Sequence, residues 1–193
     1  MAKGSSYERD VCKQLSLWFS CGTRDDLFWR SSNSGGRATM RAKRGKRTMQ
    51  GHGDIAATDP MGAPLLELLT IELKRGYSSH SFADLLDTLP HRKPRLVAQF
   101  IAQAMRSAHE AGTPGWMLVH RRDQKAAMAF VSSNVCAALR AQGALNALQA
   151  GFLRGRVRLN GDSVAFAVFQ LADFLASVPP GAVRKALAQL KSP

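Results

Sequence analysis

Hydrophobic residues recur along the chain with two spacings, which predict helices and strands in alternation. A spacing of about 3.6 residues indicates one buried helix face, and strict alternation indicates a strand. Val11, Leu15 and Phe19 form the first helical stripe. Such stripes predict helices over residues 5–20, 96–108 and 132–148, and a terminal helix is expected after Pro179-Pro180.

Short apolar runs between the helical segments predict strands. They cover residues 27–30, 54–58, 65–74, 115–120 and 126–131. Two further runs, 152–159 and 164–169, are joined by Asn160-Gly161, a strong signal for a tight hairpin turn. These elements predict an α/β fold (α+β mixed sheet), in which helices flank a central mixed β-sheet. Residues 1–150 would form its core, and residues 151–193 a C-terminal hairpin and helix within the same domain.

The charge balance of the chain indicates what it binds. The 193 residues include 27 Lys and Arg against 14 Asp and Glu, which gives a formal net charge of +13. Because 45% of the residues are hydrophobic, the chain can bury a core, and a disordered basic tail is excluded. A folded, intracellular and basic domain most often binds nucleic acid.

The cysteines and the N-terminal residues favour a cytoplasmic protein. Cys12, Cys21 and Cys136 are too few and too scattered for a disulfide framework, and no C-x-x-C pair suggests structural zinc. The first residues lead into a charged helix rather than the apolar segment of a secretory signal. No run reaches the roughly 18 apolar residues of a membrane span.

Part of the positive charge is concentrated in one polar, glycine-rich stretch, which we interpret as a long loop. This basic cluster contains no acidic residue, and it consists of Arg37, Arg41, Lys43, Arg44, Lys46 and Arg47. Clusters of this kind bind phosphates because they release condensed counterions. The alternative is a solvated surface segment without a ligand.

The run at residues 65–74 is apolar on both faces until it nears its end, as expected for a central strand. Because side chains alternate along a strand, Glu72 and Lys74 point to the same face. A carboxylate and an amine thus lie side by side at the end of a buried strand. The alternative is an ordinary ion pair at an exposed strand end.

Asp54 is expected to lie near Glu72. Asp59, Pro60 and Gly62 are favourable turn residues, so residues 54–58 and 65–74 are predicted to pair as a hairpin. This pairing would bring Asp54 and Glu72 to the same end of the sheet. Taken alone, Asp54 could be only a turn residue after Gly53.

Two carboxylates and a lysine in this arrangement fit phosphodiester hydrolysis. Asp54 and Glu72 supply the oxygen ligands that Mg²⁺ prefers. The ion activates a water molecule and neutralises charge on the phosphoryl group. Lys74 can orient or help deprotonate the water and stabilise the transition state.

Gly53-Asp54 followed by Glu72-Leu73-Lys74 resembles the signature of the PD-(D/E)XK nucleases, which have the restriction-endonuclease-like fold. Gly53 takes the place of the proline that names the motif. Residues 29–36 and the segment Tyr7-Glu8-Arg9 resemble the archaeal Holliday-junction-resolvase branch and its phage-encoded relatives. The resemblance covers residues 4–131 in the order of elements.

This resemblance implies a Mg²⁺-dependent endodeoxyribonuclease, commonly a homodimer, that acts in the host cytoplasm if a phage encodes it. Mn²⁺ is an expected substitute for Mg²⁺. Asp54 and Glu72 would bind the metal, Lys74 would assist catalysis, and Glu8 would complete the site. DNA contacts are assigned to Arg30 and to the basic cluster, and branched DNA is one candidate substrate.

Some of these residues have a purely structural interpretation as well. Ser5-Ser6-Tyr7-Glu8 is a capping-box sequence, in which Glu8 would bond the backbone N–H of Ser5. His52 can be an incidental loop residue, and Gln99 a boundary residue of its helix. Ser31, Ser32 and Ser34 are candidate donors through the resemblance alone. The alternative functions are a non-catalytic basic DNA-binding protein and a duplex or end-processing nuclease of the same fold.

Overall fold

The structure is a computed structural model of the chain, and it describes residues 3–31, 53–86, 96–146, 148, 151–159 and 161–192. The basic cluster between positions 37 and 47, His52, Ser32 and Ser34 lie outside the described residues. The elements in chain order are α1 (Lys3–Phe19), β1 (Phe28–Arg30), β2 (Ile55–Ala57), η1 (Pro60–Gly62), α3 (Ala63–Leu68), β3 (Leu69–Arg75), η2 (Phe82–Leu85), α4 (Leu96–Ala111), β4 (Gly115–Arg121), β5 (Ala127–Ser132), α5 (Ser133–Ala141), β6 (Leu153–Leu159), β7 (Asp162–Gln170), α6 (Leu171–Ser177) and α7 (Pro180–Lys191).

A five-stranded mixed sheet forms the centre of the fold, in the order β3-β4-β5-β7-β6. β3 and β4 run parallel, with α4 between them in the chain, and the other neighbours are antiparallel. β1 and β2 form a separate two-stranded antiparallel sheet. The predicted class, a mixed sheet flanked by helices, is therefore confirmed.

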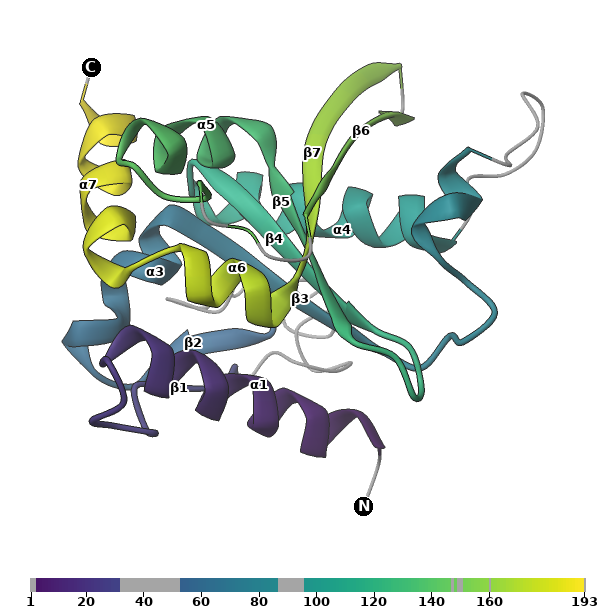
Figure 1. The fold of residues 1–193 in the computed structure, drawn as a ribbon. Coiled ribbons are helices and arrows are strands. Elements are labelled where there is room, and N and C mark those ends of the chain that lie inside the picture. Colours follow the sequence, from purple (N-terminus) through teal and green to yellow (C-terminus); the bar gives the residue numbers. More distant parts are fainter. Residues whose placement is uncertain are drawn as a thin grey trace, which may run out of the picture.

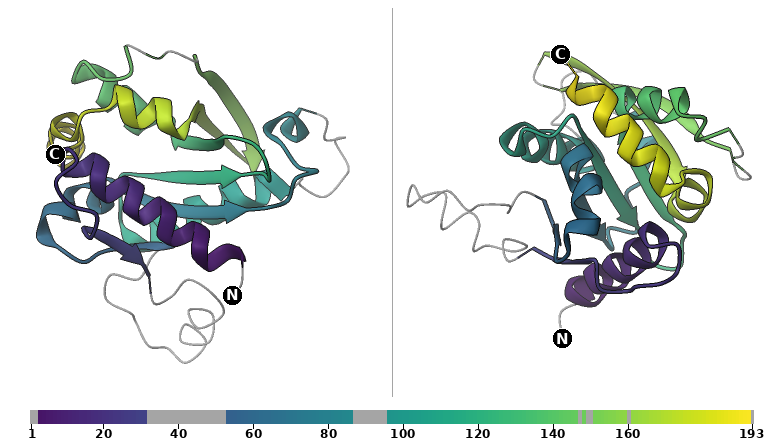
Figure 2. Two further views of the ribbon diagram at one scale, coloured as in Figure 1. Left: turned by 60° about the horizontal axis from the view of Figure 1, so that its bottom comes forward. Right: turned by 90° about the vertical axis from the view of Figure 1, so that its left-hand side faces the viewer.

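Alternation along the strands divides the core into two layers (Figures 1 and 2). On one face, Trp116, Leu118 and Phe130 pack against the apolar side of α4. On the other face, Met117 and Val119 belong to a larger cluster that includes buried residues of α1, α5, α6 and α7. β3 is a terminal strand of the sheet, so its outer edge is open to the segment around Asp54.

The predicted hairpin between residues 54–58 and 65–74 is wrong. β2 pairs with β1 instead, and residues 63–68 form helix α3, so that the strand begins only at Leu69. The side chain of Asp59 accepts a hydrogen bond from the N–H of Met61 and caps η1, and Pro64 lies in the first turn of α3. Asp and Pro favour helix starts as well as turns, and the chain here uses the former.

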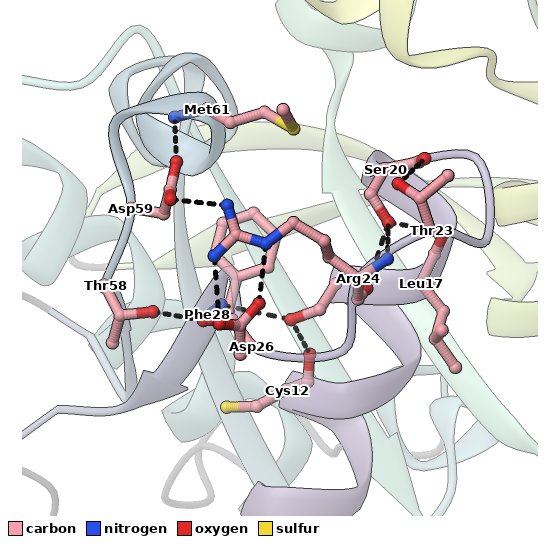
Figure 3. A network of polar contacts seen from close by, with 11 residues as sticks. Cys12, Leu17, Ser20, Thr23, Arg24, Asp26, Phe28, Thr58, Asp59 and Met61 are labelled. Carbon is pink, nitrogen blue, oxygen red and sulfur yellow. Dashed lines mark hydrogen bonds and ion pairs between the residues drawn. The ribbon is translucent and has the colours of Figure 1, made fainter.

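A polar network joins α1 to β1 and to the segment after β2 (Figure 3). The guanidinium of Arg24 forms ion pairs with Asp26 at 2.8 Å and with Asp59 at 2.6 Å. The buried hydroxyl of Ser16 donates to the carbonyl of Cys12 at 2.8 Å and accepts from the N–H of Phe28 at 3.0 Å. These bonds fix the small sheet against the helix that carries Glu8.

The C-terminal segment completes the large sheet. β6 and β7 pair as the predicted hairpin, and Gly161 at the turn has a φ of +93°. The predicted terminal helix is α7, whereas α6 was not anticipated, and the helix predicted over residues 132–148 ends at Ala141. Within the described part of the chain, no helix has the length and apolar character that a membrane crossing requires.

Candidate active site

Glu72 is a carboxylate buried at the interface between β3 and α4. Its side chain is only 3% exposed. Oε1 accepts a hydrogen bond from the hydroxyl of Ser107 at 2.8 Å, and Oε2 accepts one from the amide of Gln103 at 2.9 Å. Both donors lie on α4, so the helix that covers this face of the sheet also fixes the carboxylate in place.

Lys74 lies on the same face of β3, as the alternation predicted. Its Nζ approaches Oε2 of Glu72 at 3.4 Å. The ammonium also lies 5.6 Å from the ring centroid of Phe100, which belongs to α4. The side chain is 17% exposed, so the amine is held between a carboxylate and an aromatic ring but keeps access to solvent.

Asp54 reaches β3 from its outer edge. The N–H of Asp54 donates to the carbonyl of Ile71 at 2.9 Å. Its Oδ2 accepts from the N–H of Leu73 at 2.7 Å. Ile71 and Leu73 are the residues before and after Glu72, so these two bonds hold Asp54 against β3 at the level of Glu72. Asp54 reaches this position on a docked loop and not through the predicted hairpin.

Gly53 is required by this docking. Its φ is +79°, and a Cβ at this position would lie 2.7 Å from the carbonyl oxygen of Ile71 and 2.9 Å from Cγ2 of Thr70. Proline, whose φ is fixed near −65°, cannot adopt this conformation. The departure from the motif at Gly53 therefore has a structural reason.

Ser31 holds the other side of the same segment. Its N–H donates to the carbonyl of Asp54 at 2.9 Å, and its hydroxyl donates to the carbonyl of Gly53 at 2.7 Å. The residue is 3% exposed. Ser31 thus positions the backbone around Asp54, and its hydroxyl is engaged by the protein itself.

Glu8 forms an ion pair with Arg30, which pairs across the small sheet with Ile55, the residue next to Asp54. Oε2 of Glu8 and Nε of Arg30 are 3.0 Å apart. Both charges, together with that of Asp54, act on the buried thiol of Cys12. Burial first, and then Glu8 and Asp54, raise the pKa of Cys12 to about 12, which Arg30 opposes. The charges of Glu8, Arg30 and Asp54 therefore all act on this part of α1.

The capping interpretation of Glu8 does not fit the structure, because α1 begins at Lys3 and Ser5 is already inside the helix. Arg30, predicted as a DNA contact, forms its ion pair with Glu8. Gln99 is exposed, whereas Gln103, one turn further along α4, contacts Glu72. Gln103 and Ser107 were missed, although Gln99, Gln103 and Ser107 follow one another at intervals of four residues and so mark a polar edge on an apolar helix.

Burial raises the pKa of Glu72, and the neighbouring charge of Asp54 raises it further. Lys74 and the hydroxyl of Ser107 act in the opposite direction. Two neighbouring carboxylates that repel each other are stabilised when they bind a cation. In the described residues, however, no three His, Cys, Asp or Glu side chains are grouped closely enough to hold a metal ion. Asp54 and Glu72 supply hard oxygen donors suited to Mg²⁺.

Comparison with known proteins adds one finding. A family model with the description "Phage putative PDDEXK endonuclease" matches residues 1–185. The five-stranded mixed sheet flanked by helices is consistent with the restriction-endonuclease-like fold. No curated protein and no solved structure matches the chain.

Proposed function

We propose that this chain, which belongs to the phage PDDEXK endonuclease family, hydrolyses phosphodiester bonds of DNA with a divalent metal ion held by Asp54 and Glu72. The observation that carries the proposal is the buried carboxylate of Glu72, with Lys74 at 3.4 Å and with the charge of the docked Asp54 acting on it. A carboxylate with this little exposure and a like charge beside it is typical of a catalytic site.

The donor set favours Mg²⁺, with Mn²⁺ as the substitute, because all of its candidate ligands are carboxylate oxygens. When bound, such an ion lowers the pKa of a water molecule and neutralises charge on the phosphoryl group. We assign Glu8 as the third acidic group, because the sequence resemblance implies this role and its ion-pair partner Arg30 pairs with Ile55, the residue next to Asp54.

The remaining residues of the site act by positioning and by charge. Lys74 presents an ammonium that can orient the attacking water and stabilise the negative charge of the transition state. Gln103 and Ser107 hold both oxygens of Glu72, so the carboxylate needs no reorganisation to act. Ser31 and Gly53 set the position of Asp54.

The resemblance of the sequence to resolvases carries the finer part of the proposal. It favours branched DNA as the substrate, a homodimer as the active form, and the host cytoplasm as the place of action. A duplex or end-processing nuclease would use the same site. The basic cluster and Arg30 are the proposed contacts to phosphates.

A panel of four-way junction, flap, duplex and single-stranded DNA, incubated with Mg²⁺ or with EDTA, tests this function. We expect Mg²⁺-dependent cleavage of at least one form by the wild type, and none by Asp54→Asn, Glu72→Gln or Lys74→Ala. Glu67→Gln is the matched control, because Glu67 lies on α3 and is half exposed. Salt-dependent binding without cleavage of any form would overturn the nuclease assignment and leave a binding protein.

A further inference from the structure

β6 carries arginines at every second position. Arg154, Arg156 and Arg158 are all exposed, and we call them the β6 arginine row. The residues between them face the core layer of α4: Leu159 is buried there, Val157 packs against it, and Gly155 leaves room for the ring of Phe166. Alternation therefore places the three guanidinium groups on the opposite face of the hairpin.

Arg140 on α5 extends this row. Its guanidinium lies over the ring of Phe152, with 4.8 Å between its Cζ and the ring centroid, and Arg154 lies over the same ring at 5.5 Å. Nη2 of Arg140 is buried and has no hydrogen-bond partner among the described residues. The ring thus holds two positive charges side by side at one end of the row.

Few acidic residues lie in this part of the chain. Beyond residue 125 the sequence contains only Asp162 and Asp173. No ion pair joins the β6 arginine row to an acidic residue within the described ranges. Exposed arginines without acidic neighbours keep their full charge for an external anion.

We infer that the β6 arginine row binds the phosphodiester backbone of duplex DNA, as a second contact surface of the chain. Alternate residues of a strand are about 6.7 Å apart, so the row is about 13 Å long. Phosphates of one DNA strand advance about 3.4 Å along the axis, so the row matches about four base pairs. Guanidinium groups bind phosphates in pairs of parallel hydrogen bonds. The choice of DNA as the anion rests on the proposed function.

The row is distant from the candidate active site. β6 and β3 are opposite edges of the sheet. Arg158 pairs with Ser163, while Lys74 lies at the level of Gln170, which is the other end of β7. Strand spacing and rise together separate Arg158 from Lys74 by about 30 Å. The row therefore contacts a part of the substrate remote from the scissile bond.

The structure also permits a simpler role for these arginines. β6 is an edge strand, and charged side chains protect such edges against pairing with a second chain. In that case their loss would cause self-association and leave DNA binding unchanged. The experiment below separates the two roles.

The test compares full-length wild type with Arg156→Gln/Arg158→Gln, using fluorescence anisotropy with a labelled duplex of about 30 base pairs, in EDTA, from about 50 to 200 mM NaCl. We expect affinity to fall about tenfold or more and the slope of log K against log salt to fall by about two. Arg156→Lys/Arg158→Lys should retain most of the affinity. Arg184→Gln/Lys185→Gln, which removes two exposed charges from α7, is the control and should change the slope less.

An unchanged slope in Arg156→Gln/Arg158→Gln would overturn the inference, and self-association of that variant in light scattering would then assign the row to edge protection. An equal loss of slope and affinity in Arg184→Gln/Lys185→Gln would overturn it too, because any pair of exposed positive charges would then contribute equally to DNA binding. The proposed function is judged separately, by Mg²⁺-dependent cleavage in the wild type. A different result is a wild type that cleaves no DNA while Arg156→Gln/Arg158→Gln still shows the reduced salt slope of binding. That result would overturn the proposed function and retain the inference.

Discussion

The side-chain amide of Gln103 donates to Oε2 of Glu72 at 2.9 Å. Lys74 approaches the same oxygen, and Ser107 occupies the other one. α4 therefore does more than cover the sheet, because it fixes the orientation and influences the ionisation of the carboxylate at the centre of the proposed site.

Removing one of these donors should move the pH dependence of cleavage. The hydroxyl of Ser107 lowers the pKa of Glu72 by bonding its charged form, so Ser107→Ala should raise that pKa. We expect the acidic limb of the pH–rate profile to move upward by about one to two units, the worth of one hydrogen bond to a charged group. Ser107→Thr keeps the hydroxyl and should move it less. A rate that falls equally at every pH would show that Ser107 only supports the fold.

Glu72 should contribute to catalysis at the expense of stability. Its pKa in the folded protein lies above the ordinary value of 4.5, so the protonated form is favoured by folding. This stabilisation is complete below the unfolded pKa and is lost as pH rises through the folded pKa. We therefore expect wild-type Tm to fall, relative to that of Glu72→Gln, as pH rises from about 4 to 8. Mg²⁺ should raise the Tm of the wild type again, and it should not raise that of Glu72→Gln.

Thermal unfolding at several pH values, with and without Mg²⁺, checks this prediction. Glu67→Gln is again the control, because Glu67 is an exposed carboxylate with a surface partner, Lys191. If Glu72→Gln and Glu67→Gln show the same pH dependence and the same response to Mg²⁺, Glu72 is not a metal ligand.

The docking of Asp54 should depend on the absence of a side chain at Gly53. Gly53 and Gly22 both have a positive φ, but a Cβ at Gly22 would have no atom within 4 Å. Gly22→Ala should therefore cost about 1–2 kcal/mol of unfolding free energy, from conformation alone. Gly53→Ala should cost at least about 1 kcal/mol more, because the Cβ meets the backbone of β3. Denaturant unfolding measures both, and equal losses would contradict the close approach.

Glu8 and Arg30 can be separated by kinetics. If Glu8 is the third acidic group, Glu8→Gln should lower kcat by about 10- to 100-fold, whereas Arg30→Gln should act mainly on KM through DNA binding. Steady-state cleavage at saturating DNA makes the distinction. An equal fall in kcat for both variants would mean that Glu8 acts only as one half of its ion pair.

The local pattern was sufficient for part of this site. Glu72 and Lys74 were placed on one face because strand alternation holds wherever the strand forms, and the Asn160-Gly161 hairpin followed from its turn residues. Asp54 was expected beside Glu72 for the wrong reason. Asp59 and Pro64 suit a turn and a helix start equally, and only packing of α3 decides between them.

The contacts of Gln103 and Ser107 could not be predicted, because they join residues more than thirty positions apart. The contacts of Ser31 with Gly53 and Asp54 could not be predicted either, because these residues lie more than twenty positions apart in the sequence. The apolar stripe of α4 predicted the helix, but it did not predict which strand the polar edge would meet.

The docking of Asp54 has a consequence for how inactive variants behave. Its N–H and Oδ2 occupy the carbonyl of Ile71 and the N–H of Leu73, which are outward-facing groups of a terminal strand. The residue proposed to hold the metal therefore also closes one side of the sheet to the strands of other molecules. Asp54→Ala would leave the N–H of Leu73 without its partner, along with the loss of cleavage. Asp54→Asn, which keeps an acceptor oxygen, is the variant that separates chemistry from aggregation.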